Sequence, residues 1–191
     1  ARSIQQTSDG SYIVAGETYS GASGYDFWVL KLNSDGTVAW QNTYGGTSND
    51  FARSIQQTSD GGYIVAGYTY SFGAGNYDYW VLKLKSNGDV EWQKTYGGTS
   101  DDYANSIQQT SDRGYIVVGE TYSFGAGNKD YWVLKLDSDG TVAWQNTYGG
   151  ANYDEAYSIQ QTSDGGYIVA GGTNSFGAGG YDYWVLKLNS D

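Results

Sequence analysis

The sequence repeats one unit at an interval of 52 residues, and this period constrains the fold more than any other feature. A repeat of this length predicts one small structural unit per copy, because a single copy cannot bury its apolar surface without neighbours. The copies are nearly identical, so the chain is interpreted as one repeat domain, 1–191, with units at 1–51, 52–103, 104–155 and 156–191. Two series of tryptophans mark the period, namely Trp28, Trp80, Trp132 and Trp184, and Trp40, Trp92 and Trp144.

Each copy carries the pattern of four β-strands. Short runs of β-branched and aromatic residues alternate with turn residues, and no helical periodicity competes with them. Two of the turns contain Asp-Gly between apolar runs, which is the strongest short signal for a hairpin because glycine adopts a positive φ without strain. In the first copy the predicted strands are 3–7, 12–16, 27–32 and 37–43.

These units predict an all-β fold, a β-propeller of four blades. The second and third strands of each copy carry apolar residues on both faces, so each sheet requires cover on both sides. Radial stacking of four-stranded sheets supplies that cover and leaves only short edges. A β-solenoid or an open β array is the alternative, although solenoid coils are usually shorter than this unit.

The fourth copy ends after its third strand, so the last blade lacks its fourth strand. Three arrangements are compatible with this end: a compact four-bladed ring with a trimmed last blade, an excerpt from a longer array, or a half that is completed by oligomerisation with another chain. The first copy begins inside the repeat without an initiator methionine, which indicates a processed product or part of a longer array.

The runs SIQQTSDGGYIVAG and DYWVLKL, the second followed by a Ser-Asp-Gly or Ser-Asn-Gly turn, resemble the long repeats of secreted bacterial and archaeal β-propeller proteins. The resemblance covers the whole chain and recurs in every copy. It implies propeller architecture and an extracellular or cell-surface location. It also implies a structural or adhesive role, and it implies no particular activity.

Composition excludes several classes of partner. The formal net charge is −11, with 10 basic and 21 acidic residues, and the basic residues form no cluster. We therefore expect no nucleic-acid partner, since phosphate backbones are bound by clustered Lys and Arg. No apolar run approaches the ~20 residues of a membrane span, so no membrane insertion is expected. Histidine and cysteine are absent, which leaves only hard oxygen ligands for a metal.

The long loops give the candidate binding surface. In a propeller, the loops between the second and third strands and those between blades open on the same end, whereas both Asp-Gly hairpins lie on the other. Aromatic side chains in these loops could stack on sugar rings, and packing within the loop is the alternative. The candidate ligand-binding residues are Tyr19, Tyr70, Phe72, Tyr122, Phe124 and Phe176.

Carboxylates displayed on the same end of the predicted propeller, among them Asp50, Asp102 and Asp154 between blades, could form repeated calcium sites. The alternative is that they cap turns by accepting hydrogen bonds from nearby backbone amides, which suits aspartates that recur at one place in every copy. No cofactor is required by the sequence, and binding of Ca²⁺ is left open. The candidate ligands are Asp26, Asp50, Asp78, Asp101, Asp102, Asp130, Asp154 and Asp182.

The tryptophans are expected to be structural. Trp28 and its equivalents stand in a strand of valine and leucine, which predicts core packing. Trp40 and its equivalents stand in a less apolar fourth strand, where we expect them to hold one blade against the next.

Function is the least determined feature of the sequence. Without histidine or cysteine most catalytic triads and dyads are unavailable, and catalysis needs one differentiated site, whereas these copies are almost interchangeable. The sequence thus predicts a non-enzymatic extracellular structural or adhesive repeat module, whose partners are further copies or other surface proteins. A lectin-like, glycan-binding propeller is the alternative.

Overall fold

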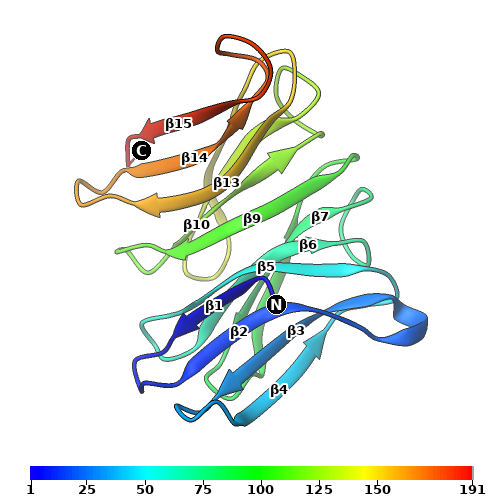
Figure 1. Cartoon of the computed structure of the whole chain (residues 1–191), viewed down its shortest axis with the longest axis vertical. Helices are drawn as coiled ribbons and strands as arrows, with labels where there is room; N and C mark the ends of the chain where they lie inside the picture. The colour runs from blue at the N-terminus through cyan, green and yellow to red at the C-terminus, as the bar shows by residue number, and fades with distance from the viewer. Residues whose placement is uncertain (191) are drawn as a thin grey trace.

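The computed structural model describes residues 1–190 and shows four antiparallel sheets stacked in chain order. Three sheets have four strands and the last has three, so the predicted β-propeller architecture with a shortened last blade is confirmed. Figure 1 shows the blades following one another from the blue N-terminal blade to the red C-terminal blade, which lie at opposite ends of the array. The predicted end of the last blade, Asp191, lies outside the described residues.

The strands within each blade are adjacent in the sheet in sequence order. Blade 1 comprises β1 (Ser3–Gln6), β2 (Tyr12–Tyr19), β3 (Tyr25–Leu32) and β4 (Val38–Tyr44), with a short 3₁₀ turn η1 (Gly21–Ser23) between β2 and β3. Blade 2 comprises β5 (Asp50–Gln57), β6 (Tyr63–Thr69), β7 (Asp78–Leu84) and β8 (Val90–Tyr96). Blade 3 comprises β9 (Asp102–Gln109), β10 (Tyr115–Thr121), β11 (Asp130–Leu136) and β12 (Val142–Tyr148). Blade 4 comprises β13 (Asp154–Gln161), β14 (Tyr167–Thr173) and β15 (Asp182–Leu188).

The observed strands extend further toward the long-loop end than the sequence predicts. β2 continues to Tyr19 because Thr18 pairs with Asp26 and Tyr19 pairs with Tyr25. Polar residues of types that are common in loops therefore take part in the pairing of β2 with β3. The first strands of later blades also begin early, and a bulge after Ala52 keeps β5 in register with β6. The connections between blades are correspondingly shorter.

The core lies between the blades. In β3, Phe27 and Val29 face blade 2, and the ring of Phe27 lies 4.6 Å from that of Trp80. Tyr79 meets Trp132 and Tyr131 meets Trp184 in the same way, with ring centroids 4.7 Å apart in both pairs. The hydroxyl of each of these tyrosines donates to the backbone oxygen of the tryptophan that it contacts, at 3.1 and 3.0 Å. Each junction therefore repeats the same aromatic pair.

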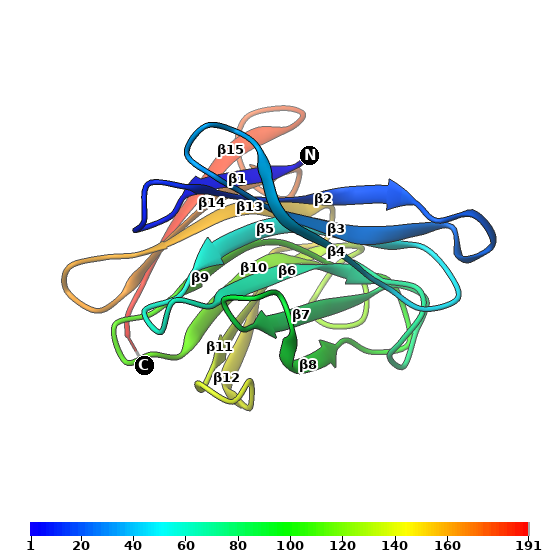
Figure 2. The ribbon, with the colours of Figure 1, turned by 90° about the horizontal axis from the view of Figure 1, so that it is seen from below.

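The first strand of each blade carries a second repeated contact. The backbone N–H of Gln57 donates to Oε1 of Gln5 in the preceding blade, at 2.6 Å. The same bond joins Gln109 to Gln56 and Gln161 to Gln108. The paired glutamines thus bind adjacent blades together along β1, β5, β9 and β13, which follow one another across the array in Figure 1 and overlap in the view from below in Figure 2.

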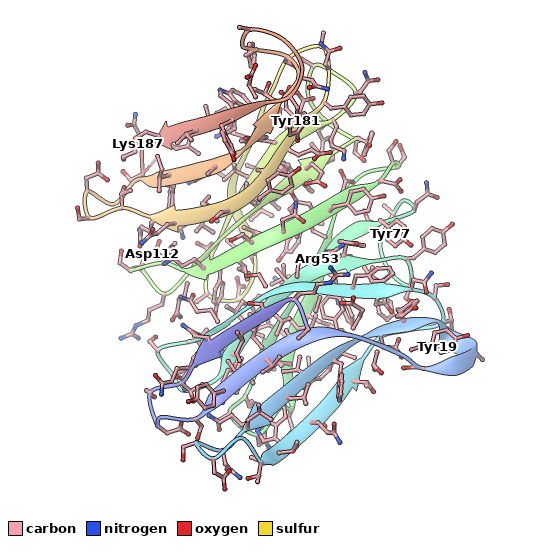
Figure 3. The ribbon with its side chains drawn as sticks, viewed as in Figure 1. Tyr19, Arg53, Tyr77, Asp112, Tyr181 and Lys187 are labelled. Carbon is pink, nitrogen blue, oxygen red and sulfur yellow. The ribbon has the colours of Figure 1, made fainter. Side chains whose placement is uncertain are left out.

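The two ends of the blades differ as the strand order requires. In Figure 3, Tyr19 at the end of β2 and Tyr77 in the loop after β6 lie on the right, whereas Asp112 in the hairpin between β9 and β10 lies on the left. No helix within residues 1–190 is long and apolar enough to cross a membrane.

One hairpin departs from the repeat. The turn positions Gly10, Gly61 and Gly165 have φ values of 78°, 82° and 84°, and Arg113 occupies the same place in blade 3 with φ 69°. A positive φ brings the Cβ atom of an L-residue close to its own backbone and costs about 1–2 kcal/mol. Blade 3 therefore carries a strained residue that the other blades avoid.

We expect Arg113→Gly to raise the free energy of unfolding by about 1 kcal/mol, since relief of the left-handed strain exceeds the extra entropy of glycine in the unfolded chain. Denaturant titration measures this change. Arg113→Ala is the control, because it removes the side chain and keeps the strain. A stabilisation by alanine equal to that by glycine would contradict the explanation.

Candidate functional site

A pocket of about 420 Å³ opens between blades 2 and 3 near the long-loop end. Its walls come from the start of β5 and β9, the end of β6 and β10, and the loops that follow β6 and β10. We call it the tyrosine pocket. It is lined by Phe51, Arg53, Tyr68, Tyr77, Tyr103, Asn105, Glu120, Tyr122 and Lys129.

Aromatic rings form most of its wall. The ring of Tyr68 stands edge-on to Tyr103 at 4.8 Å and to Tyr77 at 5.3 Å, and Tyr77 lies 5.5 Å from Tyr103. Phe51 packs 5.3 Å from Tyr68 on the side of blade 1. Edge-to-face packing holds each ring by its neighbours, so the wall is preorganised.

Two cations are fixed against this wall. The guanidinium of Arg53 lies over the ring of Tyr68, with Cζ 5.0 Å from the centroid, and donates to the Tyr68 hydroxyl. The ammonium of Lys129 lies 5.1 Å from the centroid of Tyr122 and pairs with Glu155 at 2.6 Å. Arg53 and Tyr77, both labelled in Figure 3, line the same pocket. Both cations are therefore held by the protein and do not project freely into solvent.

Glu120 is the buried acid of the pocket, with 8% of its surface exposed. Asn105 donates to its Oε2 at 2.5 Å, and Lys129 lies 3.8 Å from its Oε1. Burial raises the pKa of the Glu120 carboxyl to about 7; Glu155 adds to this rise, whereas Lys129, Asn105 and Arg53 oppose it. Near neutral pH the carboxyl can thus either donate or accept a hydrogen bond.

The pocket is built from the positions at which the copies differ. Part of the divergence among the copies gathers in space, because four variable positions lie at the long-loop end of the blades, whereas other differences, such as Lys85, Lys94 and Arg113, lie elsewhere in the repeat. The framework around them is nearly the same in every copy, so a difference at these positions changes the lining of the pocket. The four sets are Arg2, Arg53, Asn105 and Tyr157; Glu17, Tyr68, Glu120 and Gly172; Phe51, Tyr103 and Glu155; and Tyr25, Tyr77, Lys129 and Tyr181.

The chain resembles known β-propellers. Residues 7–38 and 58–91 match the model of a family described as "Domain of unknown function (DUF5122) beta-propeller". A search of the curated proteins gives no match to this sequence.

Two solved structures match this chain. The WD40 domain of Pan2 from Neurospora crassa is 16% identical over 98% of this chain, with a TM-score of 0.53. Sqt1 from Chaetomium thermophilum is 12% identical over 88% of this chain, with a TM-score of 0.48. The chain spans 61% and 40% of the lengths of these two proteins, respectively.

The predicted ligand-binding aromatics are distributed over several places. Tyr122 lines the tyrosine pocket, and Tyr70 lies beside it, 5.1 Å from Tyr77. Tyr19 lies apart from the pocket, against Tyr25 at 5.4 Å. The three loop phenylalanines pack on the core tryptophans of their own blades, at 5.3, 5.1 and 5.1 Å: Phe72 on Trp80, Phe124 on Trp132 and Phe176 on Trp184.

The predicted calcium ligands lie mostly inside the protein. The expectation that Asp50, Asp102 and Asp154 are displayed between blades is wrong, because each is the first residue of a strand and is fully buried. Asp50 accepts from the N–H of Gly46 at 2.9 Å and from the Ser71 hydroxyl at 2.8 Å. The same bonds recur at Asp102 with Gly98 and Ser123, and at Asp154 with Gly150 and Ser175.

The aspartates before the third strands have equivalent roles. Oδ2 of Asp78 accepts from the N–H groups of Ala74 and Gly75, at 2.9 and 3.1 Å, and burial raises the pKa of this carboxyl. Asp130 and Asp182 accept hydrogen bonds from their loops in the same way, and Asp26 is buried. Oδ1 of Asp101 accepts from the N–H of Tyr77 at 3.3 Å. Residues 1–190 contain no group of three or more acidic side chains arranged to hold a metal ion.

Close packing around these aspartates explains the Tyr-Gly-Gly sequence that ends each complete blade. A Cβ atom at Gly97 would lie 1.7 Å from Oδ1 of Asp78 and 2.9 Å from Oδ2 of Asp102. Only glycine permits this approach, so the motif serves to pack the blade junction.

The tryptophans occupy two environments. Trp80 and Trp132 are buried at blade junctions, whereas Trp28 in the first blade is half-buried. Trp40 lies 5.9 Å from the ring of Tyr63 in the next blade. Trp92 and Trp144 make the equivalent contacts with Tyr115 and Tyr167.

We expect the stability of the protein to fall as pH rises from about 4.5 to about 7, because the folded state raises the pKa of Glu120 and so binds its proton more tightly than the unfolded state. The stabilising effect is complete below the unfolded pKa and is lost as pH passes the folded value. The shift corresponds to a maximum of about 3 kcal/mol.

Denaturant unfolding of the Glu120→Gln variant between pH 4 and 8 tests this expectation. The variant should lose most of the pH dependence that Glu120 contributes. Glu91→Gln is the control, because Glu91 lies exposed on the outer strand β8. A pH profile unchanged by Glu120→Gln would contradict the assignment.

Proposed function

We propose that the chain is a non-enzymatic binding module of an extracellular or cell-surface adhesive protein, and that the tyrosine pocket binds a glycan. The observation that carries this proposal is the convergence of variable positions on one hollow. The pocket gathers four of the positions at which the copies differ, whereas the turns and the blade junctions around it are nearly the same in every copy.

The chemistry of the wall suits a sugar. Pyranose rings present apolar C–H faces, which rest on aromatic side chains, and a rim of hydroxyl groups, which require polar partners. The tyrosine rings of the pocket supply the first kind of surface. Asn105, Glu120 and Arg53 supply donors and acceptors within the same hollow, in keeping with the few polar groups that usually orient a small ligand.

The charge of the pocket favours a neutral or weakly charged ligand. Arg53 is held over Tyr68, and Lys129 is paired with Glu155 and Glu120. A phosphate group would have to compete with these carboxylates for the ammonium. The net charge of −11 would also oppose the approach of a polyanion.

The arrangement of carboxylates supports a binding role rather than hydrolysis. A glycosidase requires two carboxyl groups directed at opposite sides of one bond. Here Glu120 and Glu155 both face Lys129, and Glu155 also accepts from the hydroxyls of Tyr157 and Tyr181. These carboxylates are occupied in positioning neighbouring side chains.

The adhesive role rests on the repeat and on its resemblance to secreted propeller repeats. Repeated modules convert weak single-site binding into avidity through a high effective concentration.

We also propose that the protein can bind Ca²⁺, because carboxylate oxygens are the ligands that this ion prefers. An ion bound only to the folded state would raise the melting temperature, so melting temperatures measured with and without EDTA test this proposal.

The test is a glycan array followed by calorimetry with the sugars that bind. We expect Tyr103→Ala and Tyr77→Ala each to weaken binding at least tenfold, because each removes one wall of the pocket, and a tenfold loss corresponds to about 1.4 kcal/mol. Tyr19→Ala is the matched control, because this exposed tyrosine lies outside the pocket and should leave affinity unchanged. An array without signal, or equal loss in all three variants, would refute the proposal.

A further inference from the structure

The last blade exposes an apolar sheet face that its counterparts bury. Tyr183 and Val185 of β15 are 98% and 59% exposed. Ile168 and Ala170 of the neighbouring β14 share this face, and a hollow of about 640 Å³ opens beside them. We call the four residues the tail face.

The inner blades show what covers such a face. In blade 3 the equivalents of Tyr183 and Val185 are Tyr131 and Val133, and both are completely buried. They are covered by blade 4, where Tyr131 stacks on Trp184. The tail face is therefore one half of the interface that joins every pair of adjacent blades.

The first blade exposes the other half. Ile4 of β1 is 66% exposed, whereas its equivalent Ile55 is buried against blade 1. Trp28 is half-buried, whereas Trp80 receives the ring of Phe27. We call this set the head face; it consists of Ile4, Tyr12, Val14, Trp28, Leu30 and Leu32.

The polar groups of the two faces also match in register. Within the chain, the tyrosine hydroxyl of one blade donates to the tryptophan carbonyl of the next, as in Tyr131 to Trp184. By the same register Tyr183 would donate to Trp28. The glutamine bond seen between Gln108 and Gln161 would likewise join Gln160 to the N–H of Gln6.

We propose that a second copy of this chain docks its head face on the tail face. Continuity with the internal blade junction carries this inference, which is independent of the glycan pocket. The joint is heterologous, so it produces a closed ring if the rotation closes and a longer assembly if it does not. We expect this joint to be weaker than an internal junction. In blade 3 the fourth strand, β12, supplies Trp144, which contacts Tyr167 of blade 4. Blade 4 has no fourth strand among the described residues to make the equivalent contact.

Sedimentation velocity over a range of concentrations tests the proposal on the whole chain. The wild type should associate reversibly, and Val185→Lys should weaken association at least tenfold, because a lysine would be buried in an apolar joint. Val142→Lys is the matched control, since Val142 is a strand valine of the inner blade 3 with 37% exposure and therefore belongs to neither face. A wild type that remains monomeric at high concentration would overturn the proposal.

A mixing experiment establishes the polarity of the joint. Ile4→Lys blocks the head and Val185→Lys blocks the tail, so each variant alone should remain monomeric. Together they retain one intact head and one intact tail and should form a species of two copies. Dimers of Ile4→Lys alone would indicate tail-to-tail contact, and a mixture without dimers would exclude the joint; either result overturns the proposal. Circular dichroism spectra of all variants should match the wild type.

Discussion

The contact between a tyrosine or phenylalanine of one blade and a tryptophan of the next is the interaction on which this structure depends. Phe27 on Trp80, Tyr79 on Trp132 and Tyr131 on Trp184 share almost the same geometry. The strands that carry these rings are apolar on both faces, so no blade is stable in water by itself. Chain order, strand order and the position of the long loops all follow from stacking these sheets in sequence.

The same regularity creates the candidate site. Because the junctions are fixed by residues that are nearly the same in every copy, a substitution at the long-loop end alters the pocket and leaves the aromatic contacts between blades in place. Both blades contribute tyrosines to the pocket; blade 2 adds Arg53, while blade 3 adds Asn105, Glu120 and Lys129. One repeat sequence thereby produces one chemically distinct hollow. The open faces of the end blades arise from the same cause, since a stack without closure leaves half an interface at each end.

Local signals predicted much of the fold correctly. The Asp-Gly turns have the positive φ values that hairpins of this kind require, as at Gly10 and Gly36. Strands such as β7 could be recognised from the sequence because Trp80, Val81 and Leu82 form a continuous apolar run. The ends of strands were predicted less well, because Thr18 and Asp50 are polar residues that owe their strand conformation to pairing partners.

The candidate site could be predicted only in part. Tyr122 and the importance of the long loops follow from sequence, whereas Arg53, Tyr68 and Glu120 stand in strands that appear structural. Comparison among the copies held the missing signal, since these are positions of internal difference. These differences indicate a binding pocket only once the structure shows that the positions are adjacent.

By itself, the sequence determined the repeat, the strands and the need for blades to stack, because hydrophobic alternation and turn chemistry act over a few residues. Only the tertiary structure decided that variable residues from two blades meet in one pocket. It also decided that loop aspartates bind buried amides and that the outer faces of the first and last blades remain open. These outcomes depend on distances between residues about 50 positions apart, which no local pattern specifies.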